Sequence, residues 1–130
     1  MPMIVRHVVV GFEPPPDLAD RIKDLLQVDQ SVVTIAPTSE ALHDVIGDAD
    51  VLFGGILTPD LVEKAVRLKW LQTPSAGVKN VATPQLANST IVVTNASETH
   101  ATQISEHILA MMLAFARDLP QAVRAQDQRQ

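Results

Sequence analysis

Segments typical of strands and segments typical of helices alternate along the chain, and the connections between them are short. This order is typical of a parallel sheet, in which each helix carries the chain back by a right-handed crossover to start the next strand. Apolar runs, most of them rich in β-branched residues, predict the strands. They lie at residues 3–10, 31–36, 50–53, 69–73 and 90–95. The sequence therefore predicts the α/β class, as a flavodoxin-like open parallel five-stranded sheet with helices on both faces.

The intervening segments carry signals of helix starts and ends. Asp17 and Ser39 are expected as N-caps, because their side-chain oxygens can accept from the first free N–H groups of a helix. Pro59 suits a first helical turn, and Gly47 suits a helix end. Helices are accordingly expected at residues 17–27, 39–47, 59–67, 84–88 and about 99–117.

Composition limits the classes of function. A chain of 130 residues that is 46% hydrophobic and 19% charged fits one globular domain. Its net charge of −5 provides no basic surface for phosphates, so nucleic-acid binding is not expected. The chain has no cysteine, which excludes disulfides and cysteine-based zinc sites.

No membrane segment or secretion signal is expected either. The longest uncharged apolar run, residues 108–116, is far shorter than the roughly 20 residues that a spanning helix needs. The first apolar stretch is interrupted by Arg6 and His7 and is interpreted as a strand, not a signal peptide. We therefore expect a cytoplasmic protein that does not bind membranes.

The long C-terminal helix is polar in its first part and apolar all round in its second. A helix of this kind should be covered on more than one side, either as a central helix or by residues outside this chain. The segment 121–130 that follows is polar. We therefore predict a domain at residues 1–118 and an exit segment at residues 119–130.

In an open parallel sheet, ligands bind at the carboxyl ends of the strands. After the first strand, residues 11–16 read GFEPPP, where a dinucleotide site would need a Gly-x-Gly-x-x-Gly turn. Asp48 and Asp50 precede the third strand and therefore lie at the wrong edge for a phospho-acceptor site. The domain is predicted to bind neither nucleotide phosphates nor a phosphoryl group.

Two bends at the carboxyl edge have small or no side chains. One is Gly54-Gly55 and the other is the run 74-PSAG-77. Backbone N–H groups in such bends can form a nest for a small carboxylate. Both bends could equally be turns in which glycine provides a positive φ, and the spacing alone does not decide between these interpretations.

No catalytic or metal-binding cluster is evident. His100 and His107 are seven residues apart, about 10 Å along a helix, and cannot share a metal ion. Ser75 lacks the Gly-x-Ser-x-Gly context of a nucleophile elbow. The residues alone indicate a domain that binds a small anion and has no catalytic group of its own.

Three motifs in order carry a family resemblance. They are 68-LKWLQTPSAGVKNV-81, 91-IVVTNA-96 and 101-ATQISEHILAMMLAFAR-117. Together they resemble the N-terminal, substrate-binding half of the D-isomer-specific 2-hydroxyacid dehydrogenases. The resemblance is carried from about Asp48 onward, and the first 47 residues fit the family only in architecture.

The resemblance implies a parent enzyme that interconverts small 2-hydroxy and 2-keto acids by hydride transfer. It implies NAD or NADP as the cofactor, held by a Rossmann domain that lies outside these residues, and a homodimer in the full-length protein. The catalytic Arg, Glu or Asp, and His of the family also lie outside, so Glu106 and His107 receive no catalytic role. The 130-residue chain alone is expected to be inactive.

The resemblance also implies site residues. The bend of Ser75, Ala76 and Gly77 matches the loop whose N–H groups hold the substrate carboxylate, and Gly54 with Gly55 matches a neighbouring loop of the pocket. Two positions nearer the long helix are added. Thr102 matches the region at the nicotinamide end of the cofactor, and His100 is unusual at that edge of the pocket.

Where many members have Asp before the Asn of this bend, this chain has Lys79. An acid that stabilises the loop is therefore not expected at that position.

Two other functions stay open: a free-standing flavodoxin-like binding or regulatory module, and a corepressor-like or phosphonate-oxidising relative of the same family. In the family, the long helix leads into the nucleotide domain. We therefore expect its apolar half to be partly bare here, and the isolated chain to self-associate or rearrange.

Overall fold

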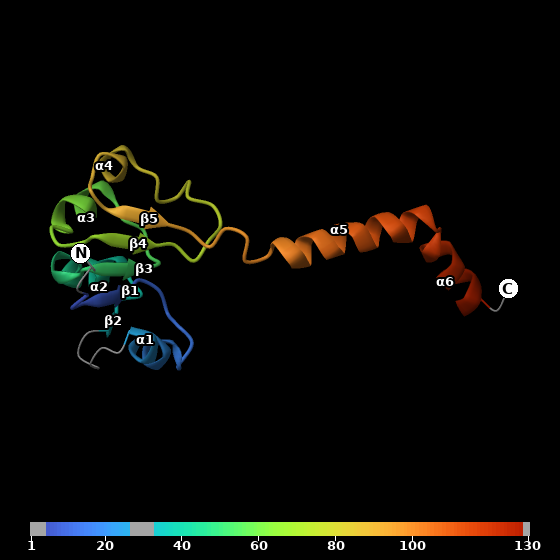
Figure 1. Ribbon diagram of the computed structural model, residues 1–130, viewed down its shortest axis with the longest axis horizontal. Coiled ribbons are helices and arrows are strands. Elements are labelled where there is room, and N and C mark those ends of the chain that lie inside the picture. The colour runs from blue at the N-terminus through green and yellow to red at the C-terminus, as the bar shows by residue number, and fades with distance from the viewer. Residues whose placement is uncertain (1–4, 27–32, 129–130) are drawn as a thin grey trace. The chain divides into compact units, whose positions relative to one another are not determined.

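The computed structural model describes residues 5–26 and 33–128. Its centre is a sheet of five parallel strands in the order β2-β1-β3-β4-β5 (Figure 1). The strands are β1 (Val8–Val10), β2 (Val33–Ile35), β3 (Val51–Phe53), β4 (Trp70–Gln72) and β5 (Val92–Thr94). The predicted parallel α/β sheet is confirmed. The observed strands are shorter than the predicted segments, and residues 3–4 and 31–32 of those segments lie outside the described residues.

Helices connect the strands in the predicted order. They are α1 (Leu18–Leu26), α2 (Ser39–Val45), the short 3-10 helix η2 (Ile46–Asp48), α3 (Pro59–Lys64), α4 (Pro84–Ala87), α5 (Ala101–Ala116) and α6 (Leu119–Asp127). Pro59 begins α3, as predicted. Residue 27 of the first predicted helix lies outside the described residues.

The predicted cap of α2 is wrong by one residue. Thr38, not Ser39, is the N-cap: its backbone is extended and its Oγ1 accepts from the N–H of Ala41 at 3.1 Å. A capping residue needs extended φ and ψ, and Ser39 already has helical geometry. The predicted end at Gly47 is also wrong, because α2 ends at Val45 and Gly47 lies inside η2.

One face of the sheet carries the core. Side chains alternate between faces along a strand, so Val9, Leu52 and Leu71, which are paired in register, point the same way. All three are fully buried. The cluster around them takes in residues of α2, η2, α3 and α4, among them Leu42, Ile46, Leu61 and Leu86.

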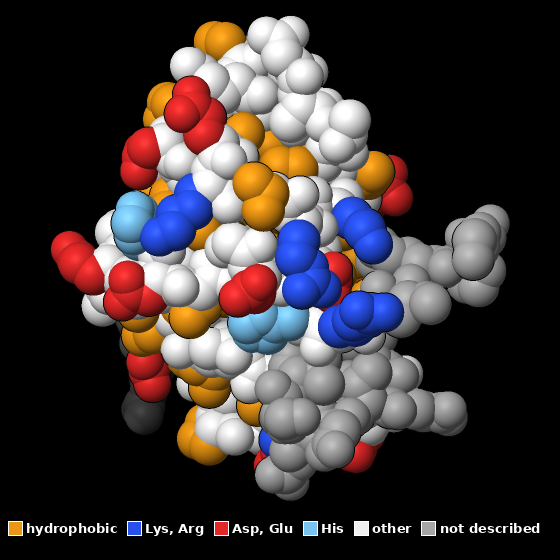
Figure 2. Space-filling model, turned by 90° about the vertical axis from the view of Figure 1, so that its left-hand side faces the viewer, with side chains coloured by type: hydrophobic (Ala, Val, Ile, Leu, Met, Phe, Trp, Pro, Cys, Tyr) orange, Lys and Arg blue, Asp and Glu red, His pale blue; other side chains and the backbone are white. Residues whose placement is uncertain are grey.

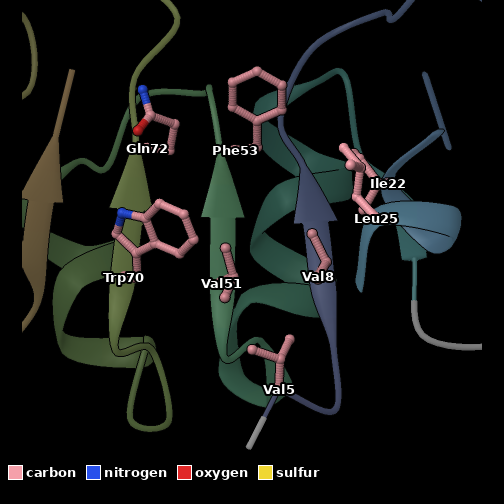
Figure 3. Close-up of a pocket in the computed structure, with 8 residues that line it drawn as sticks. All are labelled: Val5, Val8, Ile22, Leu25, Val51, Phe53, Trp70 and Gln72. Atoms are coloured by element: carbon pink, nitrogen blue, oxygen red, sulfur yellow. The ribbon is translucent and has the colours of Figure 1, made fainter. Parts of the chain in front are cut away.

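On the opposite face, the side chains of β1 and of Val51 on β3 are buried, while Trp70 and Gln72 on β4 are half-buried. Figure 3 shows Val8, Val51 and Trp70 on three neighbouring strands, with Ile22 and Leu25 reaching in from α1. These side chains line an apolar hollow of about 220 Å³. Helices therefore lie on both faces, as predicted, but the coverage is uneven.

The chain divides into two compact units at Ala96–Ser97, and α5 and α6 form the second. No residue of α5 is buried, and Met112, Leu113 and Phe115 are between 62% and 70% exposed. A central helix and a cover from outside this chain both stay predictions, because this exposure describes α5 within its own unit. Self-association of the isolated chain stays a prediction, as does the domain boundary at residue 118.

The predicted exit segment 119–130 is largely helical, because it contains α6. Within residues 5–26 and 33–128, no helix is both long and apolar enough to span a bilayer.

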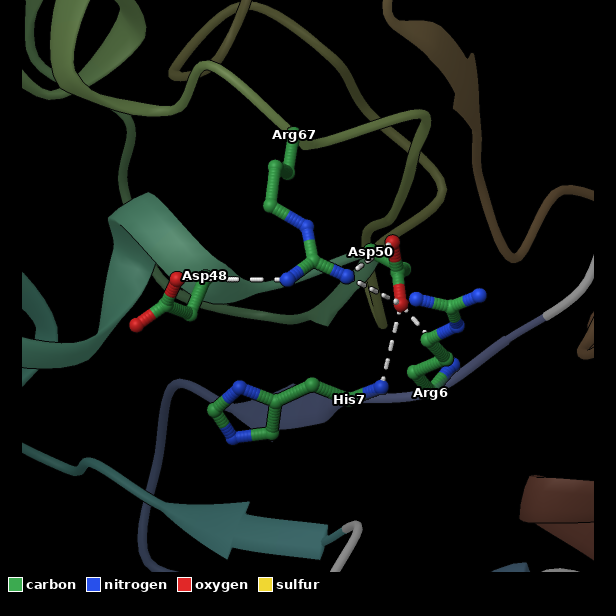
Figure 4. A network of polar contacts seen from close by, with 5 residues as sticks. All are labelled: Arg6, His7, Asp48, Asp50 and Arg67. Carbon is green, nitrogen blue, oxygen red and sulfur yellow. Dashed lines mark hydrogen bonds and ion pairs between the residues drawn. The ribbon is translucent and has the colours of Figure 1, made fainter.

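A buried carboxylate joins the amino ends of β1 and β3 (Figure 4). Asp50 is 2% exposed, and its Oδ2 accepts from the N–H groups of Arg6 at 2.8 Å and His7 at 3.1 Å. The Arg67 guanidinium donates to the same carboxylate at 3.3 Å. Burial raises the pKa of Asp50, but these three donors outweigh it and hold the pKa below the usual 3.8.

Lysine and arginine side chains gather on this face of the molecule (Figure 2). Arg6, Arg67 and Lys69 line a hollow of about 550 Å³ together with Asp50 and Thr90. Arg67 also approaches Asp48 at 3.9 Å. Arg67 thus pairs with a buried and an exposed carboxylate at the edge opposite to the glycine bends.

We expect Asp50→Asn to destabilise the sheet by about 1–3 kcal/mol, because an amide has one acceptor oxygen where the carboxylate has two. Asp48→Asn is the matched control: Asp48 is 85% exposed and only 3.9 Å from the same arginine, so its loss should cost under about 0.5 kcal/mol. Urea unfolding followed by the fluorescence of Trp70, the only tryptophan, measures both. Equal costs for the two variants would contradict the role given to Asp50.

Asp50→Asn should also change how the free energy of unfolding depends on pH. Because the folded pKa of Asp50 is lowered, its contribution to stability is present above the unfolded pKa of about 3.9 and is lost as the pH falls through the folded pKa. The free energy of unfolding should therefore fall less steeply below about pH 4 in Asp50→Asn than in the parent chain.

Gly54 and Gly55 end β3 in a conformation that favours glycine, with φ of +74° and +77°. A Cβ on Gly54 would lie 2.4 Å from Cδ1 of Phe12, whose ring meets that of Phe53 edge to face. Gly11 is just as confined, since a Cβ there would lie 2.9 Å from Cα of Gly55. The interpretation of Gly54-Gly55 as a turn with positive φ is therefore correct.

Gly54→Ala should cost about 1–3 kcal/mol in the free energy of unfolding, because it adds both backbone strain and a clash. Gly77→Ala is the control, since no atom lies within 4 Å of a Cβ built there and its φ is not positive. It should change stability by less than about 0.5 kcal/mol. Thermal unfolding of the two variants side by side tests this, and an equally destabilised Gly77→Ala would count against it.

Candidate functional site

The two bends that the sequence singled out lie at one edge of the sheet. Gly54-Gly55 follows β3 and the bend at residues 74–77 follows β4, and these strands pair in parallel register. The N–H of Gly54 donates to the carbonyl of Gln72 at 2.8 Å, which links the two strand ends. Gly54, Gly55, Ser75, Ala76 and Gly77 therefore share the carboxyl edge, where open parallel sheets bind ligands.

Three carbonyls of the second bend are held by donors. The Ser75 carbonyl accepts from the N–H of Ala96 at 3.1 Å. The Ala76 carbonyl accepts from Nδ2 of Asn95 at 2.7 Å, and the Gly77 carbonyl accepts from the Ser75 hydroxyl at 2.8 Å. Two of these donors come from the end of β5, so the bend is tied to the neighbouring strand.

The Ser75 side chain belongs to the interior of the bend. Because its proton goes to the Gly77 carbonyl, the contact of 2.9 Å with Thr73 must have the Thr73 hydroxyl as its donor. Thr73 is 5% exposed, and its Oγ1 also accepts from the N–H of Ser75 at 3.3 Å. The two hydroxyls thus form a relay that shapes the bend.

The bend presents backbone donors to the outside. The N–H groups of Gly77 and Val78 donate to no acceptor in the described part of the chain. Residues 74–80 are all exposed, and the φ of Gly77 is not positive. The interpretation of Gly77 as a residue needed for positive φ is therefore wrong, and adjacent N–H groups of this kind are suited to bind an anion.

The sequence did not single out two residues that build this site. Thr73 and Asn95 stand at the ends of β4 and β5. Polar residues just after a strand are a signal of the site edge, but their hydrogen-bond partners depend on the tertiary pairing of the strands.

The remaining candidates lie elsewhere. His7 donates to or accepts from the Thr34 hydroxyl at 2.8 Å, at the amino half of the sheet. Thr102, Glu106 and His107 are exposed on α5, and His100 immediately precedes it, so all four belong to the second unit. Among the described residues, no group of three His, Asp or Glu side chains could hold a metal ion.

A family model matches most of the chain. Residues 8–119 match the D-isomer specific 2-hydroxyacid dehydrogenase catalytic domain. The D-3-phosphoglycerate dehydrogenase of Methanocaldococcus jannaschii is 37% identical over 106 residues, which cover 79% of this chain and 20% of that protein. The chain thus spans about a fifth of the length of the curated relatives it matches.

Solved structures agree in fold. The apo D-mandelate dehydrogenase of Rhodotorula graminis superimposes with a TM-score of 0.70 at 20% identity, over 96% of this chain and 41% of that one. The D-lactate dehydrogenase of Aquifex aeolicus, solved with NAD and lactic acid, gives a TM-score of 0.62 at 20% identity, over 94% and 37%. With the family match over residues 8–119, this chain belongs to the D-isomer specific 2-hydroxyacid dehydrogenases, as a match to their catalytic domain.

Proposed function

We propose that this chain is the substrate-binding part of an NAD(P)-dependent oxidoreductase that interconverts small 2-hydroxy and 2-keto acids by hydride transfer. Membership of the family supports the reaction class. The lactic acid and NAD in the similar D-lactate dehydrogenase support a small 2-hydroxy acid and a nicotinamide cofactor.

The main support for the proposal is the hydrogen bonding of the bend after β4, in which carbonyls are occupied and N–H groups are not. The carbonyls of Ser75, Ala76 and Gly77 are occupied by donors, while the N–H groups of Gly77 and Val78 have no acceptor among the described residues. A carboxylate supplies two acceptor oxygens and a negative charge, which match two adjacent donors. In the bend of Ser75, Ala76 and Gly77, the N–H groups of Gly77 and Val78 then hold the substrate carboxylate, and Gly54 with Gly55 forms the neighbouring wall.

The first unit does not fit the cofactor. The turn after β1 has Gly11 packed against the backbone of Gly55, and residues 14–16 are prolines without N–H groups. The pyrophosphate of a dinucleotide needs free N–H groups at such a turn. We therefore assign NAD or NADP chiefly to residues outside this chain, with Thr102 near the nicotinamide end.

The catalytic Arg, acid and His are assigned to the same outside residues. Hydride transfer would be the chemistry of the cofactor, and the bend's role is to hold and orient the acid. The chain alone should bind the acid and should show no dehydrogenase activity. In the full-length protein we expect a cytoplasmic homodimer.

The test is an NMR titration of the isotope-labelled 130-residue chain with lactate, and in parallel with lactamide, which has the same shape but no charge. Lactate should shift the amide signals of residues 76–78 in a saturable way, and lactamide should not. Gly77→Ala, whose added methyl group would project beside these N–H groups, should weaken lactate binding while the fold remains intact.

Absence of any saturable shift at residues 76–78 would overturn the assignment of the carboxylate to this bend. Equal shifts with lactamide would indicate that the charge is not recognised there.

A further inference from the structure

One side chain at the end of β5, that of Asn95, contacts the proposed substrate bend. Asn95 directly follows β5 and is half-buried. Its Nδ2 donates to the carbonyl of Ala76 at 2.7 Å, across a sequence separation of 19 residues. The next residue, Ala96, donates its N–H to the carbonyl of Ser75 at 3.1 Å.

Because the peptide bond is planar, these contacts to carbonyls also fix the directions of N–H groups. A carbonyl and the N–H of the following residue lie in one plane and point in opposite directions. Fixing the Ala76 carbonyl therefore fixes the N–H of Gly77. In the same way, the bond from the Ser75 hydroxyl to the Gly77 carbonyl fixes the N–H of Val78.

Hydrogen bonds are the means by which this peptide plane is held. The space beside Gly77 is open, since a Cβ built on it would meet no atom within 4 Å beyond its chain neighbours. Glycine also accepts both orientations of the preceding peptide plane at little cost. Removing the Asn95 donor therefore takes away a contact that holds the Ala76–Gly77 plane, and with it the direction of the Gly77 N–H.

We infer that Asn95 is a positioning residue, which orients the Gly77 N–H toward the substrate carboxylate by holding the Ala76 carbonyl. The inference rests on the proposed function of the bend. It gives the residue after β5 a part in substrate binding, through the carbonyl of Ala76.

The decisive variant is Asn95→Leu, which keeps the branched shape of the side chain and removes the donor. Asn88→Ala is the control: Asn88 is exposed at the end of α4, and its backbone caps that helix. Three readouts are compared in the 130-residue chain: the amide shift and heteronuclear NOE of Gly77, the Kd for lactate, and the thermal midpoint.

We expect Asn95→Leu to shift the Gly77 amide signal, to lower its NOE, and to raise the Kd for lactate about fivefold to tenfold, the effect of one lost hydrogen bond. The lactate-induced shift of Gly77 should shrink more than that of Val78, whose peptide plane is held by Ser75. Asn88→Ala should leave the three readouts at parent values. If Asn95 only stabilised the fold, Asn95→Leu would lower the thermal midpoint, and the lactate-induced shifts of Gly77 and Val78 would shrink equally.

An unchanged Gly77 amide signal, NOE and lactate Kd in Asn95→Leu would overturn the inference. If the parent chain itself shows no lactate-dependent shift at residues 76–78, the proposed function fails and the inferred role in binding fails with it. The ligand-free signal and NOE of Gly77 then still decide whether Asn95 orders the bend.

Discussion

The parallel pairing of β1, β3 and β4 is the constraint on which the first unit depends. Val9, Leu52 and Leu71 sit in register on one face and are fully buried under α2, α3 and α4. A slip by one residue would turn each of these side chains to the other face. The register therefore fixes where each strand ends, and so brings the two glycine-containing bends to one edge. At the other edge, the buried carboxylate of Asp50 ties β1 to β3 with backbone donors and one arginine.

Glycine occurs at the carboxyl edge of the sheet for two different physical reasons. Gly54 and Gly55 are required by the fold, since their φ is positive and a methyl group on Gly54 would meet Phe12. Gly77 has an ordinary φ and open space around it. Its lack of a side chain serves no packing need, which is why we associate it with a ligand. Two carbonyls of the bend around it are held by residues that follow β5, so the arrangement of its donors and acceptors depends on the neighbouring strand as well as on its own residues.

Two apolar surfaces are notable, each described within its own unit. One is the hollow on the sheet face beside α1, which is lined by the buried Val51 and the half-buried Trp70. The other is α5, whose large apolar residues are about half exposed or more. Exposed surfaces of this extent are typical of contact with further protein. The chain spans about a fifth of the length of its curated relatives, which is consistent with the proposal that the cofactor and the catalytic groups lie in residues outside it.

The alternation of apolar strand segments and helix signals was enough to predict the parallel α/β sheet, because it follows from local periodicity and the handedness of crossovers. Three family motifs were enough to identify the family. Local signals were less accurate at boundaries: Thr38 caps α2 instead of Ser39, and the polar segment after residue 118 forms α6. The hydrogen bonds of Asn95 and Thr73 could not be predicted, because they join ends of strands that become neighbours only when the sheet forms. The sequence by itself thus determined which bend lacks side chains, and the tertiary structure decided which way its N–H groups are held, because a peptide plane is oriented by partners distant in sequence.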